Sequence, residues 1–122
     1  MTNKKIMIVE DSPAIADVVR DGLEKEGFHV HTVTNGFEAL RDLEEVMPDL
    51  IISDINMPKL DGLKTCWAIQ NRLETKDIPF ILLSSQVDGD TLKRGKEIGA
   101  CYFIAKPFEM DAVIKKVREA LE

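Results

Sequence analysis

The sequence predicts an α/β fold in which a five-stranded parallel sheet is covered by helices on both faces. Five short runs rich in branched residues recur along the chain, and segments with helical periodicity separate them. The runs are apolar on both faces, as buried parallel strands are. Because 122 residues are enough for one core and too few for two, we expect a single domain over residues 1–122.

The five runs predicted as strands are short. They cover residues 6–9, 28–33, 50–53, 80–84 and 102–105. None approaches the ~20 apolar residues that a membrane-spanning helix needs. No apolar run near residue 1 is long enough for a secretion signal either, so we expect no membrane contact and a cytoplasmic protein.

A first helix is predicted between the first two strands. Ser12 can cap it, Pro13 suits its first turn and Gly27 suits its end. The helical spacing of its apolar residues predicts that all four share one face: Ile15, Val18, Val19 and Leu23.

The remaining helices follow from similar signals. Asn35 and Glu38 have the spacing of a capping box, Pro48 stops the helix that they begin, and a third helix should follow Asp61 and Gly62. The fourth helix, over residues 88–98, has the weakest pattern, because its central glycine at 95 costs ~1 kcal/mol relative to alanine. The fifth has the strongest, with Met110, Val113, Ile114, Val117 and Leu121 at helical spacing.

Five strand–helix units favour an open, doubly wound sheet over a barrel, which needs eight. In the flavodoxin-like strand order 2-1-3-4-5, the first and third strands are neighbours, and ligands bind beyond their carboxyl ends. Glu10 and Asp11 follow the first strand and Asp54 follows the third, so three carboxylates should meet there. Two such charges ~4 Å apart repel by about 4 kcal/mol at an effective dielectric of 20. A magnesium ion, which prefers oxygen ligands, would relieve this repulsion; the alternative is that each acid caps the helix that follows it.

Two further side chains face the same edge. Lys106 follows the fifth strand and Ser84 ends the fourth. An ammonium and a hydroxyl suit two oxygens of a transferring phosphoryl group, whose loose transition state mainly needs positioned charge. Taken singly, each is more commonly a surface lysine or a structural serine. Asp54 lies between the acid pair and Lys106, so it is the candidate nucleophile and would form an aspartyl phosphate.

These residues together resemble the receiver domains of response regulators in two-component signalling, including stand-alone receivers of the chemotaxis or sporulation type. The resemblance spans essentially the whole chain and includes the segment 54–62, with its Met-Pro and later Asp-Gly. It implies that Asp54 is the phosphoacceptor and that Asp11 and Asp54 bind Mg²⁺ directly. It also implies that Asn56 contributes its backbone carbonyl and that Glu10 acts through water.

The resemblance also assigns a switch. It implies that Ser84 moves toward the phosphoryl group, that Lys106 pairs with it and precedes a cis bond to Pro107, and that Phe103 occupies the aromatic switch position. Many members carry Thr at the position of Ser84 and Ala at that of Ser85, which leaves open which hydroxyl responds. Phe103 has an alternative role as a plain core residue, and it lacks a hydroxyl, so any switch there works through packing.

The partner implied by the resemblance is a sensor histidine kinase or a histidine phosphotransfer domain. The chain would be a phosphoacceptor rather than an enzyme with its own substrate, and it would signal to a downstream protein through its fourth helix, fifth strand and fifth helix. Asn56 and Gln86 are expected to tune loss of the phosphoryl group. The identity of the partners, and whether the chain is a whole regulator or a part of one, stay open.

Three alternatives remain at this point. A haloacid-dehalogenase-like phosphohydrolase would need a second acid two residues after Asp54, where the chain has Asn56. A flavodoxin-like electron carrier would need a Ser/Thr/Gly-rich phosphate loop, whereas Glu10 and Asp11 repel a flavin phosphate. A degenerate receiver that only docks to partners would have lost phosphorylation.

Other features favour no additional chemistry. The net charge of -6 argues against direct nucleic-acid binding, and the nearest basic group, residues 93–96, is expected to be a solvated helix face. His29 and His31 share a face of a predicted edge strand and are expected to be solvated. Cys66 and Cys101 lack metal-site spacing and are expected to be reduced, buried apolar residues.

Overall fold

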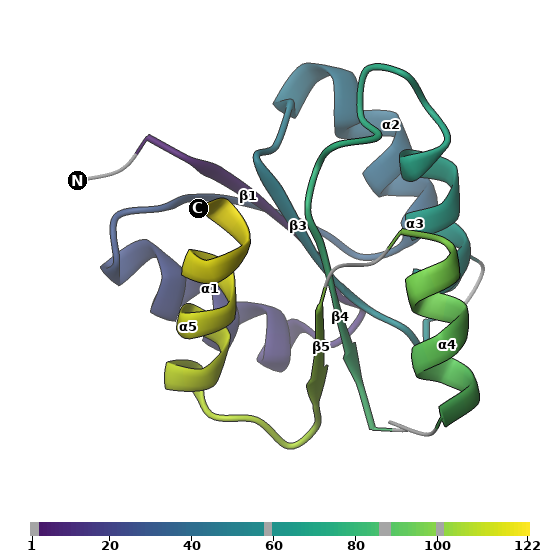
Figure 1. Ribbon diagram of the computed structural model, residues 1–122. Coiled ribbons are helices and arrows are strands. Elements are labelled where there is room, and N and C mark those ends of the chain that lie inside the picture. The colour runs from purple at the N-terminus through teal and green to yellow at the C-terminus, as the bar shows by residue number, and fades with distance from the viewer. Residues whose placement is uncertain (1–2, 58–59, 86–88, 100–101) are drawn as a thin grey trace.

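The computed structural model describes residues 3–57, 60–85, 89–99 and 102–122, and in them strands and helices alternate (Figure 1). All strand pairs are parallel, and the strand order is β2-β1-β3-β4-β5. The strands are β1 (Lys5–Val9), β2 (His29–Val33), β3 (Leu50–Asp54), β4 (Phe80–Ser84) and β5 (Tyr102–Ala105). Both the fold class and the strand order predicted from the sequence are confirmed.

Helices cover the two faces of the sheet unequally. The helices are α1 (Pro13–Lys25), α2 (Gly36–Val46), α3 (Gly62–Gln70), α4 (Gly89–Glu97) and α5 (Met110–Leu121). Figure 1 shows α1 and α5 on one face, with α2, α3 and α4 on the other. None of these helices has the length and apolar character required to cross a membrane.

The core consists of two layers separated by the sheet. Successive side chains of a strand point to opposite faces, so Met7 and Val9 of β1 pack toward α2 and α3, whereas Ile6 and Ile8 pack toward α1 and α5. Every residue of β3 and β4 is buried. The carboxyl end of β3 is therefore held rigidly between two packed layers.

Side-chain caps define where three helices begin, and those at Ser12 and Asn35 were predicted. Ser12 Oγ accepts a hydrogen bond from the backbone N–H of residue 15, Asn35 Oδ1 from that of residue 38, and Asp61 Oδ1 from that of residue 64. The capping box of α2 differs in one detail, because the Glu38 carboxylate accepts from the Thr34 backbone N–H instead of that of Asn35.

The prediction for the buried face of α1 was wrong at one position. Val18 is 55% exposed, and the buried stripe consists of Ala16, Val19 and Leu23. A helix that rests on a sheet buries only a narrow stripe, and Val18 is turned about 100° from Val19. An apolar side chain is therefore left on the outside of α1.

Gly95 explains why α4 had the weakest sequence pattern. The residue is buried, and a Cβ atom there would collide with the ring of Phe103 on β5. The glycine that lowers helix propensity thus permits α4 to lie close against β5. The helix spans Gly89–Glu97, within the predicted range, whose first residue lies outside the described residues.

Candidate metal and phosphoryl site at the carboxyl edge of the sheet

Three carboxylates converge where β1 and β3 end. The two strands are paired with Val9 beside Ser53, so the residues that follow them emerge at one edge of the sheet. One oxygen from each of Glu10, Asp11 and Asp54 can be chosen so that all three lie within 4.8 Å of one another. Glu10 and Asp54 are buried, whereas Asp11 is exposed. The predicted convergence of the acids is therefore confirmed.

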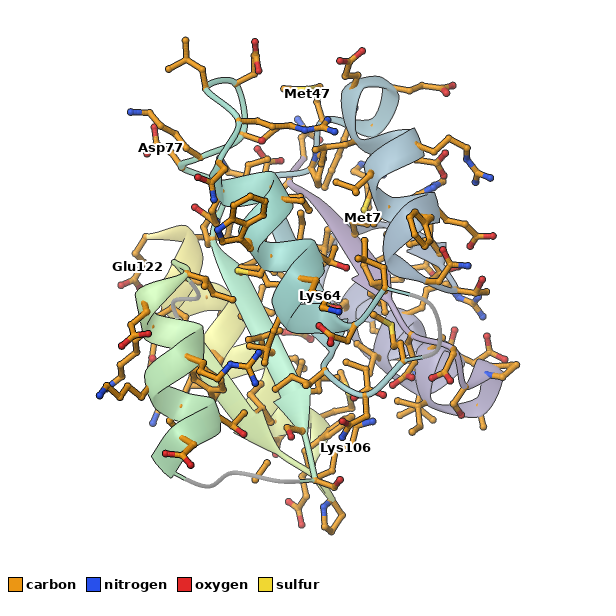
Figure 2. The ribbon with its side chains drawn as sticks, turned by 90° about the vertical axis from the view of Figure 1, so that its right-hand side faces the viewer. Met7, Met47, Lys64, Asp77, Lys106 and Glu122 are labelled. Carbon is orange, nitrogen blue, oxygen red and sulfur yellow. The ribbon has the colours of Figure 1, made fainter. Side chains whose placement is uncertain are left out.

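Lys106 provides the positive charge at this edge. Its Nζ lies 3.0 Å from Asp54 Oδ2 and 3.4 Å from Glu10 Oε1. Figure 2 shows Lys106 at the end of the sheet opposite Met47 and Asp77. Its backbone N–H donates to the carbonyl of Ser84 at 2.9 Å, which ties β5 to the end of β4. The predicted cis bond between Lys106 and Pro107 is present.

The charges at the site shift two pKa values. Burial, the negative charge of Asp54 and a hydrogen bond with Asp11 together raise the pKa of Glu10 from 4.5 to about 7. Burial alone would lower the pKa of Lys106, but its interactions with Asp54 and Glu10 outweigh burial and raise that pKa above its ordinary value. The cluster therefore lacks enough positive charge of its own.

The backbone of Asp54 is fixed by two neighbours. Ser53 Oγ donates to the Asp54 carbonyl at 2.9 Å, and the Gly62 N–H donates to the Ile55 carbonyl at 3.0 Å. A Cβ atom on Gly62 would collide with the Asp54 carbonyl oxygen, so only glycine permits α3 to begin so close to this residue. Sequence reasoning did not identify Ser53, although a serine in a fully buried apolar strand was an available signal.

The other predicted site residues lie around this centre. Ser84 is buried at the end of β4, one residue beyond the partner of Asp54 in the strand register. Asn56 is exposed and lies two residues after Asp54. Phe103 is half-buried, packs against the core on the side of α2 and α3, and meets α4 at Gly95. Gln86 lies outside the described residues.

The donor set suits a small, hard cation. The three carboxylates, one of them exposed, can supply the one or two protein carboxylates that Mg²⁺ usually takes, with waters at its remaining positions. Among the described residues, no histidine or cysteine joins the cluster, so the set does not match a zinc site. A divalent cation would also offset the excess negative charge that raises the pKa of Glu10.

An apolar groove lies directly beside the site. It has a volume of about 520 Å³, and Lys106 is part of its wall. Its other lining residues come from α1, from the end of β4 and from the β5–α5 connection: Ala14, Ile15, Val18, Ser85, Pro107 and Phe108. The exposed Val18 belongs to this groove, which the sequence did not predict because its parts are far apart in the chain.

The secondary predictions have mixed outcomes. His29 is exposed as expected, but His31 is half-buried and its Nε2 lies 2.9 Å from Asp42 Oδ2 on α2, so it is not simply solvated. Cys66 is buried, with its Sγ 4.0 Å from the carbonyl oxygen of Ile98, and Cys101 lies outside the described residues. Lys93, Arg94 and Lys96 are exposed on α4, as predicted.

A doubly wound α/β domain with clustered carboxylates and a lysine at its switch point fits the class of domains that bind a cation and a phosphoryl group there. The chain belongs to the family of the response regulator receiver domain, whose sequence model matches residues 6–118. It is thus a domain of two-component signalling, and response regulators receive their phosphoryl groups from histidine kinases.

Relatives and solved structures agree with this assignment. The phosphate regulon transcriptional regulatory protein PhoB of Rhizobium meliloti is 36% identical over 96% of this chain and 52% of its own length. Protein PilG of Pseudomonas aeruginosa is 33% identical over 93% of this chain and 84% of its own length. The chemotaxis protein CheY4 of Vibrio cholerae has a similar structure, with a TM-score of 0.94 and 30% identity over 98% of this chain and all of that one.

The comparisons also separate the alternatives. They support a receiver domain and give no support to a phosphohydrolase, an electron carrier or a docking module without phosphorylation. The chain spans about half the length of several of the curated relatives it matches, including PhoB at 52%.

Proposed function

We propose that Asp54 accepts a phosphoryl group from a phosphohistidine in a reaction that depends on Mg²⁺. The observation that supports this most strongly is the convergence of Asp54 with Glu10, Asp11 and Lys106 at one edge of the sheet. Asp11, Asp54 and the backbone carbonyl of Asn56 would bind the ion, and Glu10 would act through a bound water. When bound, such an ion would neutralise charge on the phosphoryl oxygens.

The residues of the chain position the reaction. A carboxylate oxygen of Asp54 attacks phosphorus as the P–N bond of the phosphohistidine breaks, and the bonding electron pair leaves with the imidazole. Lys106, already 3.0 Å from Asp54, stays beside the group that gains charge. Ser53 and Gly62 keep the Asp54 backbone in place, so little reorganisation is required when the donor arrives.

Phosphorylation would then favour a second conformer. New contacts from the phosphoryl oxygens to Ser84 and Lys106 would draw the ends of β4 and β5 toward Asp54. Phe103 lies three residues before Lys106, and its ring packs against Gly95 of α4. A movement of β5 would therefore also move that helix. Shifting the balance from 1:99 to 99:1 requires ~5.5 kcal/mol of differential affinity. We propose that Asn56 and Gln86 tune how long the phosphoryl group lasts.

The donor would be a sensor histidine kinase or phosphotransfer domain that rests on the apolar groove beside Lys106. Any protein that brings a histidine to Asp54 must cover the surface next to that residue, and this surface is apolar and exposed at Val18. We further propose that residues 1–122 form one receiver domain, that it works in the cytoplasm, and that it signals to a separate protein partner without contacting nucleic acid or membrane.

A transfer assay tests this function. A histidine kinase carrying a labelled phosphoryl group should lose the label to the wild-type chain in the presence of Mg²⁺ and should not lose it to Asp54→Asn. Transfer that is equally fast to Asp54→Asn, or equally fast with the metal chelated, would contradict the proposed role of Asp54 or of the ion.

A substitution in the groove separates donor docking from chemistry. Val18→Asp should slow transfer from the kinase about tenfold, because a carboxylate would be buried under the donor, while phosphorylation by acetyl phosphate stays unchanged. Phe37→Asp on α2 is the matched control, since Phe37 is 57% exposed and lies outside the groove. Wild-type transfer rates to Val18→Asp would contradict docking at this groove.

A further inference from the structure

A small hollow between α3 and α4 combines an exposed tryptophan with two basic side chains. Its lining residues are Leu63, Lys64 and Trp67 from α3, Arg94 from α4 and Ile98 just beyond it. Trp67 is 56% exposed. Figure 2 looks directly onto α3 and α4, with Lys64 near the centre of the view. The hollow shares no lining residue with the apolar groove beside Lys106.

Among the described residues, some basic side chains form ion pairs, and the two that line this hollow do not. Arg20, Arg41, Lys106, Lys116 and Arg118 each pair with a carboxylate. Within the described ranges, Lys64 and Arg94 have no carboxylate at ion-pair distance. The chain as a whole carries a net charge of -6, whereas the two charged residues that line this hollow, beside the exposed Trp67, are both basic. Such a surface attracts an acidic partner.

The size of the hollow restricts what it can take. Its volume is about 180 Å³, whereas sites for complete small-molecule ligands typically measure about 300–1,000 Å³. A single apolar side chain fits this space, with Trp67 and Ile98 as its walls. Tryptophan and arginine are also the residues that most commonly dominate binding energy at protein interfaces.

We propose that the α3–α4 hollow binds an acidic segment of a partner protein, with one apolar side chain inserted beside Trp67 and its carboxylates paired with Lys64 and Arg94. The inference rests on the proposed function in one respect only, its link to phosphorylation. Arg94 precedes Gly95, which packs on Phe103 of β5. A movement of β5 that follows from the contact between Lys106 and Asp54 would therefore change the position of α4 under a bound partner. The segment would belong to the protein that receives the signal.

Trp67 is the only tryptophan of the chain, so its fluorescence reports on this hollow directly. The probes are short synthetic peptides in which Asp and Glu flank a central Leu, Phe or Met, and the control peptides carry Lys instead of the acids. We expect at least one acidic peptide to change Trp67 emission saturably, with weaker binding at high salt, and the Lys peptides to bind at least tenfold more weakly. No saturable change with any acidic peptide, or equal binding of both sets, would overturn the proposal.

Charge-reversal variants locate the site. Arg94→Glu and Lys64→Glu should each weaken the acidic peptide about tenfold, whereas Lys115→Glu, an exposed lysine of α5 with the same change in net charge, should not. Equal effects of all three variants would mean that only net charge matters and would overturn the site. A change in emission with protein concentration alone would assign the hollow to a second copy of the chain and overturn it as well.

The link to phosphorylation is tested separately. Acetyl phosphate with Mg²⁺ should change the affinity of the wild-type chain for the peptide at least threefold and should leave that of Asp54→Asn unchanged. If Asp54→Asn binds peptide normally while wild type gains a phosphoryl group without any change in affinity, the link is wrong although the phosphoacceptor is right. Peptide binding without any gain of a phosphoryl group would instead contradict the proposed function alone.

Discussion

At the residue scale, the site is a group of charges that the fold does not neutralise by itself. Lys106 is the one cation within ion-pair distance of Glu10 and Asp54 among the described residues, and it faces three carboxylates. Burial, and after it the charge of Asp54, raises the pKa of Glu10 to about 7, so ionisation of this carboxyl is unfavourable in the metal-free fold. The functional site is therefore a place where the metal-free fold is less stable than it could be.

Replacing Glu10 should stabilise the metal-free protein. A carboxyl group whose pKa is raised on folding makes the folded state bind more protons than the unfolded one, so the stability of the metal-free chain falls as the pH rises from 4.5 to about 7. Glu10→Gln should remove this fall and raise the free energy of unfolding at pH 8 by about 1–3 kcal/mol. Urea unfolding of both proteins with a chelator, at pH 8 and at pH 5, measures this difference in the free energy of unfolding. A variant less stable than wild type at pH 8 would contradict the electrostatic account.

The same substitution should weaken the metal site. Because Glu10 contributes negative charge next to the proposed ion, Glu10→Gln should lower Mg²⁺ affinity about tenfold in a calorimetric titration. The stability gain and the affinity loss should appear in one variant. Unchanged affinity would place the ion away from Glu10.

Lys106 should matter more for switching than for acceptance of the phosphoryl group. In Lys106→Ala, Mg²⁺ can still neutralise the phosphoryl oxygens, so phosphorylation by acetyl phosphate should persist, but the contact that draws β5 toward Asp54 is lost. NMR spectra of α4 and β5 should then change little on phosphorylation. Full spectral changes in this variant would refute the coupling.

At the scale of the elements, α4 depends on one close approach. Gly95→Ala should lower the free energy of unfolding by about 1–3 kcal/mol, because the added Cβ collides with Phe103 and the helix must shift. Gly89→Ala in the same helix is the matched control. Its Cβ would meet nothing within 4 Å, so this change should stabilise the chain by at most about 1 kcal/mol. Denaturant unfolding of both variants measures the two changes in the free energy of unfolding. Equal changes would mean that packing against Phe103 does not set the position of α4.

The elements also show how far the sequence alone reaches. Branched apolar runs and the caps at Ser12, Asn35 and Asp61 are local signals, so strands, helix starts and the acidic edge could be predicted. Val18 could not be placed, because its exposure depends on how α1 is rotated on the sheet. The contact between His31 and Asp42 and the two surface hollows join residues distant in the chain, and no periodicity encodes them.

At the scale of the whole molecule, three surfaces surround one rigid sheet. The carboxyl edge holds the acids, the groove beside Lys106 is the proposed site of the donor, and the α3–α4 hollow is the proposed site of an acidic segment. Phe103 on β5 and Lys106 just after that strand connect the first of these surfaces with the last. In the proposed function, this arrangement would let one chain receive a phosphoryl group at its acidic edge and change its affinity for a partner at the α3–α4 hollow.

The most direct test of this account is the intact mass of the protein after incubation with acetyl phosphate, followed by fragmentation to locate the added group. The account predicts the addition of one phosphoryl group, dependent on Mg²⁺, located on Asp54 and absent from Asp54→Asn. A phosphoryl group on another residue, or an addition that persists in Asp54→Asn or with the metal chelated, would contradict it.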